Sequence, residues 1–151
     1  MFQSKRRSHI GRRGKQRNGT ATVEMAICLP VLLTLTLGTM DLCSLFFLRE
    51  TVTLAAYEGA RAGVASGSTN ASSLARVREF LDERGVVYTG TPATFSSPGF
   101  DSAATLEHVT VTVSVPMAGN LLLPSALYAN GDCAASVTMR KEYSNVQATG
   151  T

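Results

Sequence analysis

A predominantly apolar block lies near the N-terminus, over residues 25–48. Asp41 is the one charged residue among these 24 positions. As a helix the block would be roughly 36 Å long, which exceeds the thickness of a bilayer's hydrocarbon core, about 30 Å. A buried helix of a soluble protein is the alternative, but the roughly 100 residues that follow offer little material to surround a helix that is apolar on every side. The pattern therefore predicts a transmembrane helix.

The helical pattern continues beyond the apolar block without a break. Small and apolar residues recur there every three or four positions, a spacing that places them on one face of a helix. They are Val52, Ala56, Gly59, Ala60 and Gly63, while Arg49, Glu50, Glu58 and Arg61 would face solvent. A single helix over residues 21–65 would be roughly 68 Å long, with half of its length in the bilayer and half outside it.

A second, shorter helix is predicted over residues 71–85. Asn70 is a suitable N-cap residue, and Gly85 is a suitable stop. The apolar positions of this segment fall on one helix face and are Leu74, Val77, Phe80 and Leu81.

The remaining chain changes to the pattern of strands and loops. Residues 106–115 alternate apolar and polar side chains, which is typical of a half-buried strand, and Pro116 ends it. Residues 86–88 and 134–143 are further predicted strands, and residues 89–104 form a loop rich in Gly, Pro, Ser and Thr. Residues 121–124 are an apolar turn that would cap the core or touch the membrane or a partner.

These elements predict an α+β fold, in which a long N-terminal transmembrane helix is followed by a small domain of one helix and a few antiparallel strands. The predicted organisation is a basic cytoplasmic leader over residues 1–19, a transmembrane and extended helix over 20–65, and a small extracytoplasmic domain over 66–151.

Charge is distributed very unevenly and sets the orientation. Residues 1–23 hold seven Lys or Arg and no acidic residue, whereas the rest holds seven basic and eleven acidic side chains, a formal charge of −4. Positive charge before a span favours a cytoplasmic N-terminus and places residues 49–151 outside. A basic tip on an acidic body argues against a nucleic-acid-binding domain.

Residues that could carry chemistry are sparse. His9 and His108 are far apart, no Cys or His spacing suits a metal, and no nucleotide-binding or hydrolase motif occurs. We therefore expect no enzyme activity, no cofactor and no small-molecule substrate, and we expect His108 on the polar face of its strand. Cys28 and Cys43 lie in the apolar block, so Cys133 is either a buried small residue or a thiol for intermolecular pairing.

The junction between the basic leader and the apolar block carries the most informative motif, GTATVE, from Gly19 to Glu24. A secretory signal peptide is cut after its apolar region, whereas here the candidate site precedes it. The junction resembles the signal of type IV prepilins, which implies cleavage between Gly19 and Thr20 by a prepilin peptidase on the cytoplasmic side.

The longer pattern resembles the TadE-like pseudopilin family of tight-adherence (Flp pilus) systems. The residues that carry the resemblance are Gly19, Glu24, Pro30, Gly38, Asp41 and the stretch AAYEGARAG at 55–63. The family implies a single-pass protein of a bacterial inner membrane, with a periplasmic or extracellular C-terminal domain. It also implies other pilin or pseudopilin subunits, inner-membrane assembly proteins and membrane lipid as partners. The departures from the family are Met25, where an aromatic residue is usual, and a long leader.

Polar residues of the span have predicted roles in assembly. A carboxylate within a bilayer needs a partner, and the resemblance implies that Glu24 pairs with the new α-amine of Thr20; the alternative places Glu24 at the headgroup level. Asp41 would either extend outward to the headgroups or face another helix. Thr34, Gly38 and Asp41 share one helix face suited to close packing in lipid, unless the threonines bond their own helix's carbonyls. Pro30 removes a backbone donor and should loosen the helix locally.

Two other functions for the chain are consistent with parts of this sequence pattern. The chain could be an unprocessed single-span anchor whose outer domain binds another envelope protein. It could also be an exported soluble protein, suggested by Arg6-Arg7 and Arg12-Arg13, although neither pair precedes the hydrophobic residues of a twin-arginine signal.

Overall fold

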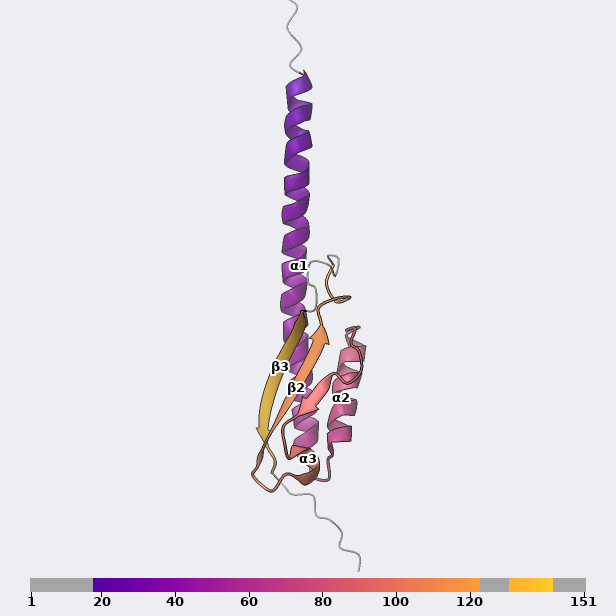
Figure 1. The fold of residues 1–151 in the computed structure, drawn as a ribbon, viewed down its shortest axis with the longest axis vertical. Helices are drawn as coiled ribbons and strands as arrows, with labels where there is room; N and C mark the ends of the chain where they lie inside the picture. The colour runs from indigo at the N-terminus through magenta and orange to yellow at the C-terminus, as the bar shows by residue number, and fades with distance from the viewer. Residues whose placement is uncertain (1–17, 123–130, 143–151) are drawn as a thin grey trace, which may run out of the picture. The chain divides into compact units, whose positions relative to one another are not determined.

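The computed structural model describes residues 18–122 and 131–142, and it has the predicted α+β fold. Its elements are α1 (Asn18–Val64), α2 (Asn70–Glu83), β1 (Ala93–Phe95), α3 (Gly99–Ser102), β2 (His108–Pro116) and β3 (Asp132–Arg140) (Figure 1). The chain divides into two compact units, Met1–Thr36 and Leu37–Thr151, here called unit 1 and unit 2. The division falls within α1, so that the second part of this helix packs with the elements that follow it.

The part of α1 in unit 1 is a helix with apolar side chains exposed on every side. Val23, Val31, Leu32 and Leu33 point in different directions around the helix, and all are more than half exposed. Among the described residues α1 is the one helix long and apolar enough to cross a membrane, as the sequence predicts. The helix continues through Pro30, which lies inside it.

Unit 2 contains a three-stranded antiparallel sheet in the order β1-β2-β3 (Figure 1). Val111 of β2 lies opposite Phe95 of β1 and opposite Val137 of β3. The predicted alternation of β2 is confirmed, because its four valines, Val109, Val111, Val113 and Val115, are fully buried while the residues between them are partly exposed. On that second face, hydroxyl groups join β2 to β3, from Thr110 to Thr138 at 2.7 Å and from Thr112 to Ser136 at 2.8 Å.

The core of unit 2 forms between the sheet, α2, α3 and the second part of α1. The α1 residues in this core are Leu48, Val52, Ala55, Ala56 and Ala60. The α2 residues are Val77, Phe80 and Leu81, and the valines of β2 and Phe100 of α3 also belong to it. The predicted apolar faces of both helices are therefore confirmed. Leu74 packs at the edge of this cluster and is partly buried. At about 25 cal/mol for each Å² of apolar surface, burial of this kind is the main stabilising term for such a unit.

The N-cap of α2 is Thr69, which corrects the sequence-based assignment to Asn70. The Thr69 side chain accepts a hydrogen bond from the backbone N–H of Ser72 at 3.2 Å, and the Ser72 hydroxyl accepts one from the Thr69 N–H at 2.9 Å. Asn70 is engaged elsewhere: its side-chain oxygen accepts from the Phe100 N–H at 2.8 Å, at the start of α3. Gly85, with φ +64°, follows the end of α2 as predicted.

The segment between α2 and β2 differs from the prediction. Residues 86–88 are not a strand, because the Val87 N–H donates to the side chain of Asn120 instead of to a neighbouring strand. The predicted loop over residues 89–104 contains β1 and α3. β2 begins at His108, not at residue 106, since Leu106 has a positive φ of 70°.

The last strand is shifted relative to its prediction and runs from Asp132 to Arg140. Of the predicted strand over residues 134–143, Tyr143 lies outside the described residues, as do the leader up to residue 17 and Leu123 and Pro124 of the predicted apolar turn.

Candidate functional site

The predicted processing site lies in the first turn of α1. The helix begins at Asn18, so Gly19 and Thr20 are its next two residues, and both are exposed. The hydroxyl of Thr22 donates to the carbonyl oxygen of Gly19 at 3.0 Å. Glu24 is also exposed, one turn further along. The residues of the junction are thus accessible within unit 1, and their roles in processing and assembly stay predictions.

The polar residues in the middle of the span bond their own helix. The Thr34 hydroxyl donates to the carbonyl oxygen of Pro30 at 2.7 Å, and the Thr36 hydroxyl donates to that of Leu33 at 3.0 Å. This is the alternative in which threonine side chains satisfy backbone carbonyls. Gly38 has open space around it, with no atom within 4 Å of an added Cβ. The face therefore has room for a neighbouring helix, and its use in packing remains a prediction.

Asp41 is buried by its own chain, an arrangement that neither predicted alternative included. Only 2 % of its surface is exposed, and its Oδ1 accepts a hydrogen bond from the backbone N–H of Leu122 at 2.8 Å. The two residues are 81 positions apart in the sequence. The turn of residues 117–122, which connects β2 to the segment before β3, therefore lies against α1 inside the predicted span.

Asn120 holds this turn in shape. Its side-chain oxygen accepts from the Val87 N–H, and its side-chain nitrogen donates to the carbonyl oxygens of Val87 and Pro116, each at 2.8 Å. Gly119 supplies a positive φ of 85°. The three side-chain bonds of Asn120 add to the turn's own backbone bond, from the Asn120 N–H to the Met117 carbonyl oxygen at 3.1 Å. Sequence reasoning missed Asn120; the tripeptide Ala-Gly-Asn before a leucine run is the signal that marks it.

The small residues of α1 allow α2 and α3 to approach closely. A Cβ added to Gly59 would overlap the Val77 side chain, and one added to Gly63 would overlap the Phe100 ring. Ser73 of α2 is fully buried, and its hydroxyl donates to the Gly59 carbonyl oxygen at 2.7 Å. The predicted stripe of small residues is therefore a packing surface within this chain.

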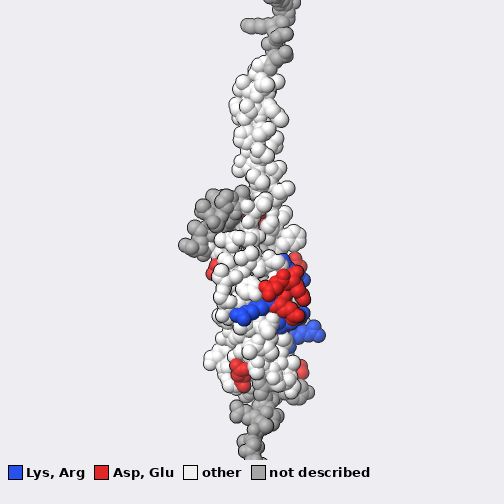
Figure 2. All heavy atoms as spheres, turned by 90° about the vertical axis from the view of Figure 1, so that its right-hand side faces the viewer, with Lys and Arg blue, Asp and Glu red and all other residues white. Residues whose placement is uncertain are grey.

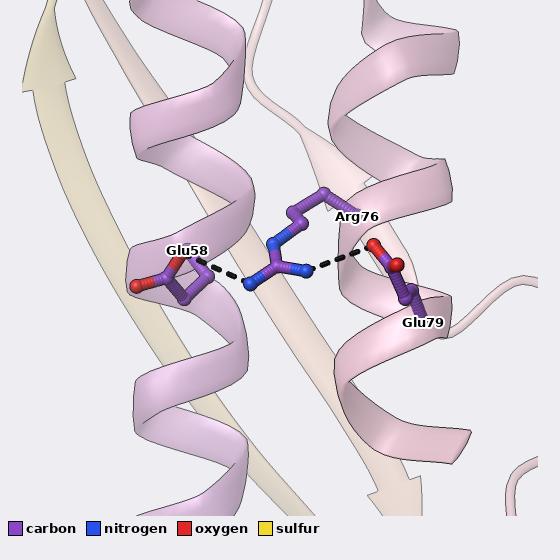
Figure 3. A network of polar contacts seen from close by, with 3 residues as sticks. All are labelled: Glu58, Arg76 and Glu79. Atoms are coloured by element: carbon purple, nitrogen blue, oxygen red, sulfur yellow. Dashed lines mark hydrogen bonds and ion pairs between the residues drawn. The ribbon is translucent and has the colours of Figure 1, made fainter. Parts of the chain in front are cut away.

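Charged residues connect the same two helices at the surface. Arg76 of α2 lies between Glu58 of α1, at 3.6 Å, and Glu79 of its own helix, at 2.8 Å (Figure 3). The hydrogen bond with Glu79 raises the pKa of Arg76. Figure 2 shows acidic and basic side chains side by side on the side of the molecule where α2 lies. Such neighbouring opposite charges do not make a one-signed patch for a nucleic acid.

Cys133 is buried on β3 with 6 % of its surface exposed, which confirms the first of its two predicted roles. Burial raises the pKa of its thiol, so the reactive thiolate is disfavoured. His108 is exposed at the start of β2, as predicted. In the described ranges no three His, Cys, Asp or Glu side chains come together in a way that could hold a metal ion.

Lys141 is a buried residue that sequence reasoning did not single out. It is fully buried directly after β3, and its ammonium group donates to the carbonyl oxygen of Phe100 in α3. Its backbone is bonded on both sides, to Leu106 at 2.7 Å and to Glu107 at 2.9 Å. The lysine therefore connects the end of the sheet to α3.

Comparison with known proteins identifies the N-terminal part of the chain. Residues 19–61 match the family described as TadE-like protein, which confirms the resemblance seen in the sequence. The match covers the apolar part of α1 and most of the small-residue stripe, and it associates the chain with proteins of the Tad pilus. No curated protein and no solved structure matches the chain.

Proposed function

We propose that this chain is a membrane-anchored pseudopilin or minor pilin that contributes to the assembly of a tight-adherence (Flp type IV) pilus or a related secretion apparatus. The observation that carries the proposal is the position of the TadE-like match. It begins at Gly19, at the junction of the basic leader and the apolar helix, and continues into unit 2.

Processing is the first step of the proposed role. A prepilin peptidase cleaves the bond between Gly19 and Thr20 on the cytoplasmic side, and the chain keeps its apolar helix as a membrane anchor. The new α-amine of Thr20 then pairs with Glu24 of the same or a neighbouring subunit, because a carboxylate at the edge of a bilayer is stabilised by an adjacent cation. The exposure of Gly19, Thr20 and Glu24 supports this step.

The proposed role of unit 2 is structural, not enzymatic. Its core contains the second part of α1, so a force or a contact at the sheet is transmitted to the anchoring helix through packed side chains such as Val52 and Ala56. The partners of the proposal are other pilin or pseudopilin subunits and the assembly proteins of a bacterial inner membrane. The basic residues before the span support a cytoplasmic leader, and the proposal therefore has unit 2 in the periplasm or outside the cell.

The test is the mass of the protein extracted from membranes that contain the cognate prepilin peptidase. We expect a mature chain that begins at Thr20. The variant Gly19→Val should keep its leader, because the residue before the cut must be small for the peptidase. Gly14→Val, a matched change within the leader, should still be processed.

The same measurement separates the proposal from the second candidate, an unprocessed anchor whose outer domain binds another envelope protein. A wild-type chain that retains its leader in the presence of the active peptidase contradicts the pseudopilin role and favours the anchor.

A further inference from the structure

The contact between Asp41 and the 117–122 turn places a piece of unit 2 beside the membrane-spanning part of α1. Asp41 lies seven residues before Leu48, the last apolar residue of the block, and this corresponds to about 10 Å along a helix. The first charged residues after the block are Arg49 and Glu50. Leu48 itself is buried in the core of unit 2, so the outer edge of the hydrocarbon layer falls between Asp41 and Leu48, close to the level at which Leu122 is attached.

The turn presents an apolar side chain at this level. Leu122 is 63 % exposed although its backbone N–H is bonded to Asp41. Its position is fixed, because Asn120 bonds Val87 and Pro116 on the other side of the turn. In water, an exposed leucine side chain on a fixed turn gains no free energy from burial. In lipid the same side chain is removed from water and favourably solvated.

Exposed apolar side chains of α1 lie near the turn as well. Leu42, Phe46 and Phe47 are 52 %, 62 % and 69 % exposed. Phe46 lines one hollow together with Met117, and Phe47 lines another together with Asn120. Charged residues line the far sides of these hollows, Arg49 and Asp132 in the first and Arg84 in the second, and so mark where the apolar surface ends. Met117 and Asn120 of the turn thus lie near the two aromatic residues, and Leu122 lies beside Asp41 of α1.

We propose that the 117–122 turn is a second membrane-contact element, with Leu122 inserted among the acyl chains of the outer leaflet and Asp41 as the group that tethers it. The occupant of the surface formed by Leu42, Phe46, Phe47 and Leu122 is lipid hydrocarbon. The bond works in both directions: Leu122 gives the carboxylate in the span a donor, and the carboxylate gives the turn's N–H an acceptor where water is absent. The inference rests on the membrane span of the proposed function and not on a role in a pilus.

The chain contains no tryptophan, so single tryptophans can report on their surroundings. Leu122→Trp is the test variant and Phe47→Trp is the reference within the span. Tyr57→Trp is the matched control, since Tyr57 is 45 % exposed on α1 and lies 16 residues beyond Asp41. Each full-length variant is reconstituted into phosphatidylcholine vesicles with brominated acyl chains, which quench tryptophan emission on contact.

We expect Leu122→Trp to be quenched to a degree comparable with Phe47→Trp and several-fold more than Tyr57→Trp. Quenching no greater than that of Tyr57→Trp overturns the proposal. If a second copy of the chain covers Leu122, the emission is blue-shifted but unquenched, and this result also overturns it. Leu35→Trp is a second reference, since Leu35 lies in the middle of the span and is 59 % exposed; absence of quenching there would contradict the membrane span itself, so the two failures are distinguishable.

The tether is tested in the Leu122→Trp background. Asp41→Asn keeps a side-chain oxygen that can accept the Leu122 N–H, whereas Asp41→Ala removes the acceptor. We expect quenching to be retained with asparagine and clearly reduced with alanine. Equal quenching in both variants overturns the role assigned to Asp41.

Discussion

At the scale of single residues, two glycines of α1 set the distance at which neighbouring elements pack. Gly63 faces the ring of Phe100, which is fully buried and packs edge-to-face with Phe95 at a centroid distance of 5.9 Å. Gly59 faces Val77 and also offers its carbonyl oxygen to Ser73. Any side chain at these positions needs space that the aromatic ring or the valine already occupies.

We expect Gly63→Ala to destabilise unit 2 by about 1–3 kcal/mol, because the new methyl group must displace a ring inside a packed core. The measurement is the midpoint of thermal unfolding of the full-length protein in detergent. Gly38→Ala is the control, since nothing lies near an added Cβ there and alanine is the better helix former. A Gly63→Ala variant as stable as the control would contradict the packing described for α1.

The N-cap of α2 shows why single positions are difficult to assign from sequence. Thr69 and Asn70 are adjacent, and both are good capping residues. The choice is made by α3, which lies 30 residues away and bonds the side chain of Asn70. Local preference identified the cap to within one residue, and a long-range hydrogen bond decided between the two.

At the scale of elements, apolar packing holds α2 against α1, and the charged contacts lie outside it. Val77 is fully buried between the helices, whereas Arg76, the residue before it, lies at the surface between Glu58 and Glu79. An ion pair at a hydrated surface adds little to stability, because the charges are already well solvated when separated.

We therefore expect Val77→Ala to lower the free energy of unfolding by about 2 kcal/mol through the cavity that it leaves. Arg76→Ala should lower the free energy of unfolding much less, and this loss should be smaller still at high salt. Equilibrium denaturation at low and high ionic strength checks both. A larger loss with Arg76→Ala than with Val77→Ala would show that the ion pairs, not the apolar face, dock the helix.

The strands differ in how well their patterns predict them. β2 has nine residues with regular alternation, so its faces follow from the sequence, because successive side chains of a strand point to opposite sides. β1 has three residues, which is too short for a period to be visible, and it is a strand because Thr94 and its neighbours pair with β2. Residues 86–88 have suitable side chains, but Asn120 takes the backbone bond that a strand partner would need.

At the scale of the whole molecule, the asymmetry of charge predicts how the chain is oriented in a membrane. Seven basic residues precede the span, and Arg49 and Glu50 cancel after it. Basic residues are retained on the cytoplasmic side during insertion, so the leader is expected inside and unit 2 outside.

Alkaline phosphatase fused to the C-terminus should accordingly be active in bacterial cells, because the enzyme folds only outside the cytoplasm. A green fluorescent protein fused at the same place and exported through the Sec pathway should be dark. Phosphatase fused after Arg17, before the span, should be inactive and serves as the control. A fluorescent C-terminal fusion together with an inactive phosphatase would reverse the proposed orientation.

The sequence by itself determined the features that depend on local pattern. These are the long apolar helix, its stripe of small residues, the strand at β2, the α+β class and the TadE-like start at Gly19. Each follows from a period or a composition that can be read within a few turns of chain. Only the tertiary structure decided the contacts between distant residues: the bond from Leu122 to Asp41, the bonds of Asn120 to Val87, and the burial of Lys141. The physical reason is that a side chain's partner in a folded core is set by how whole elements pack, and no local period encodes that.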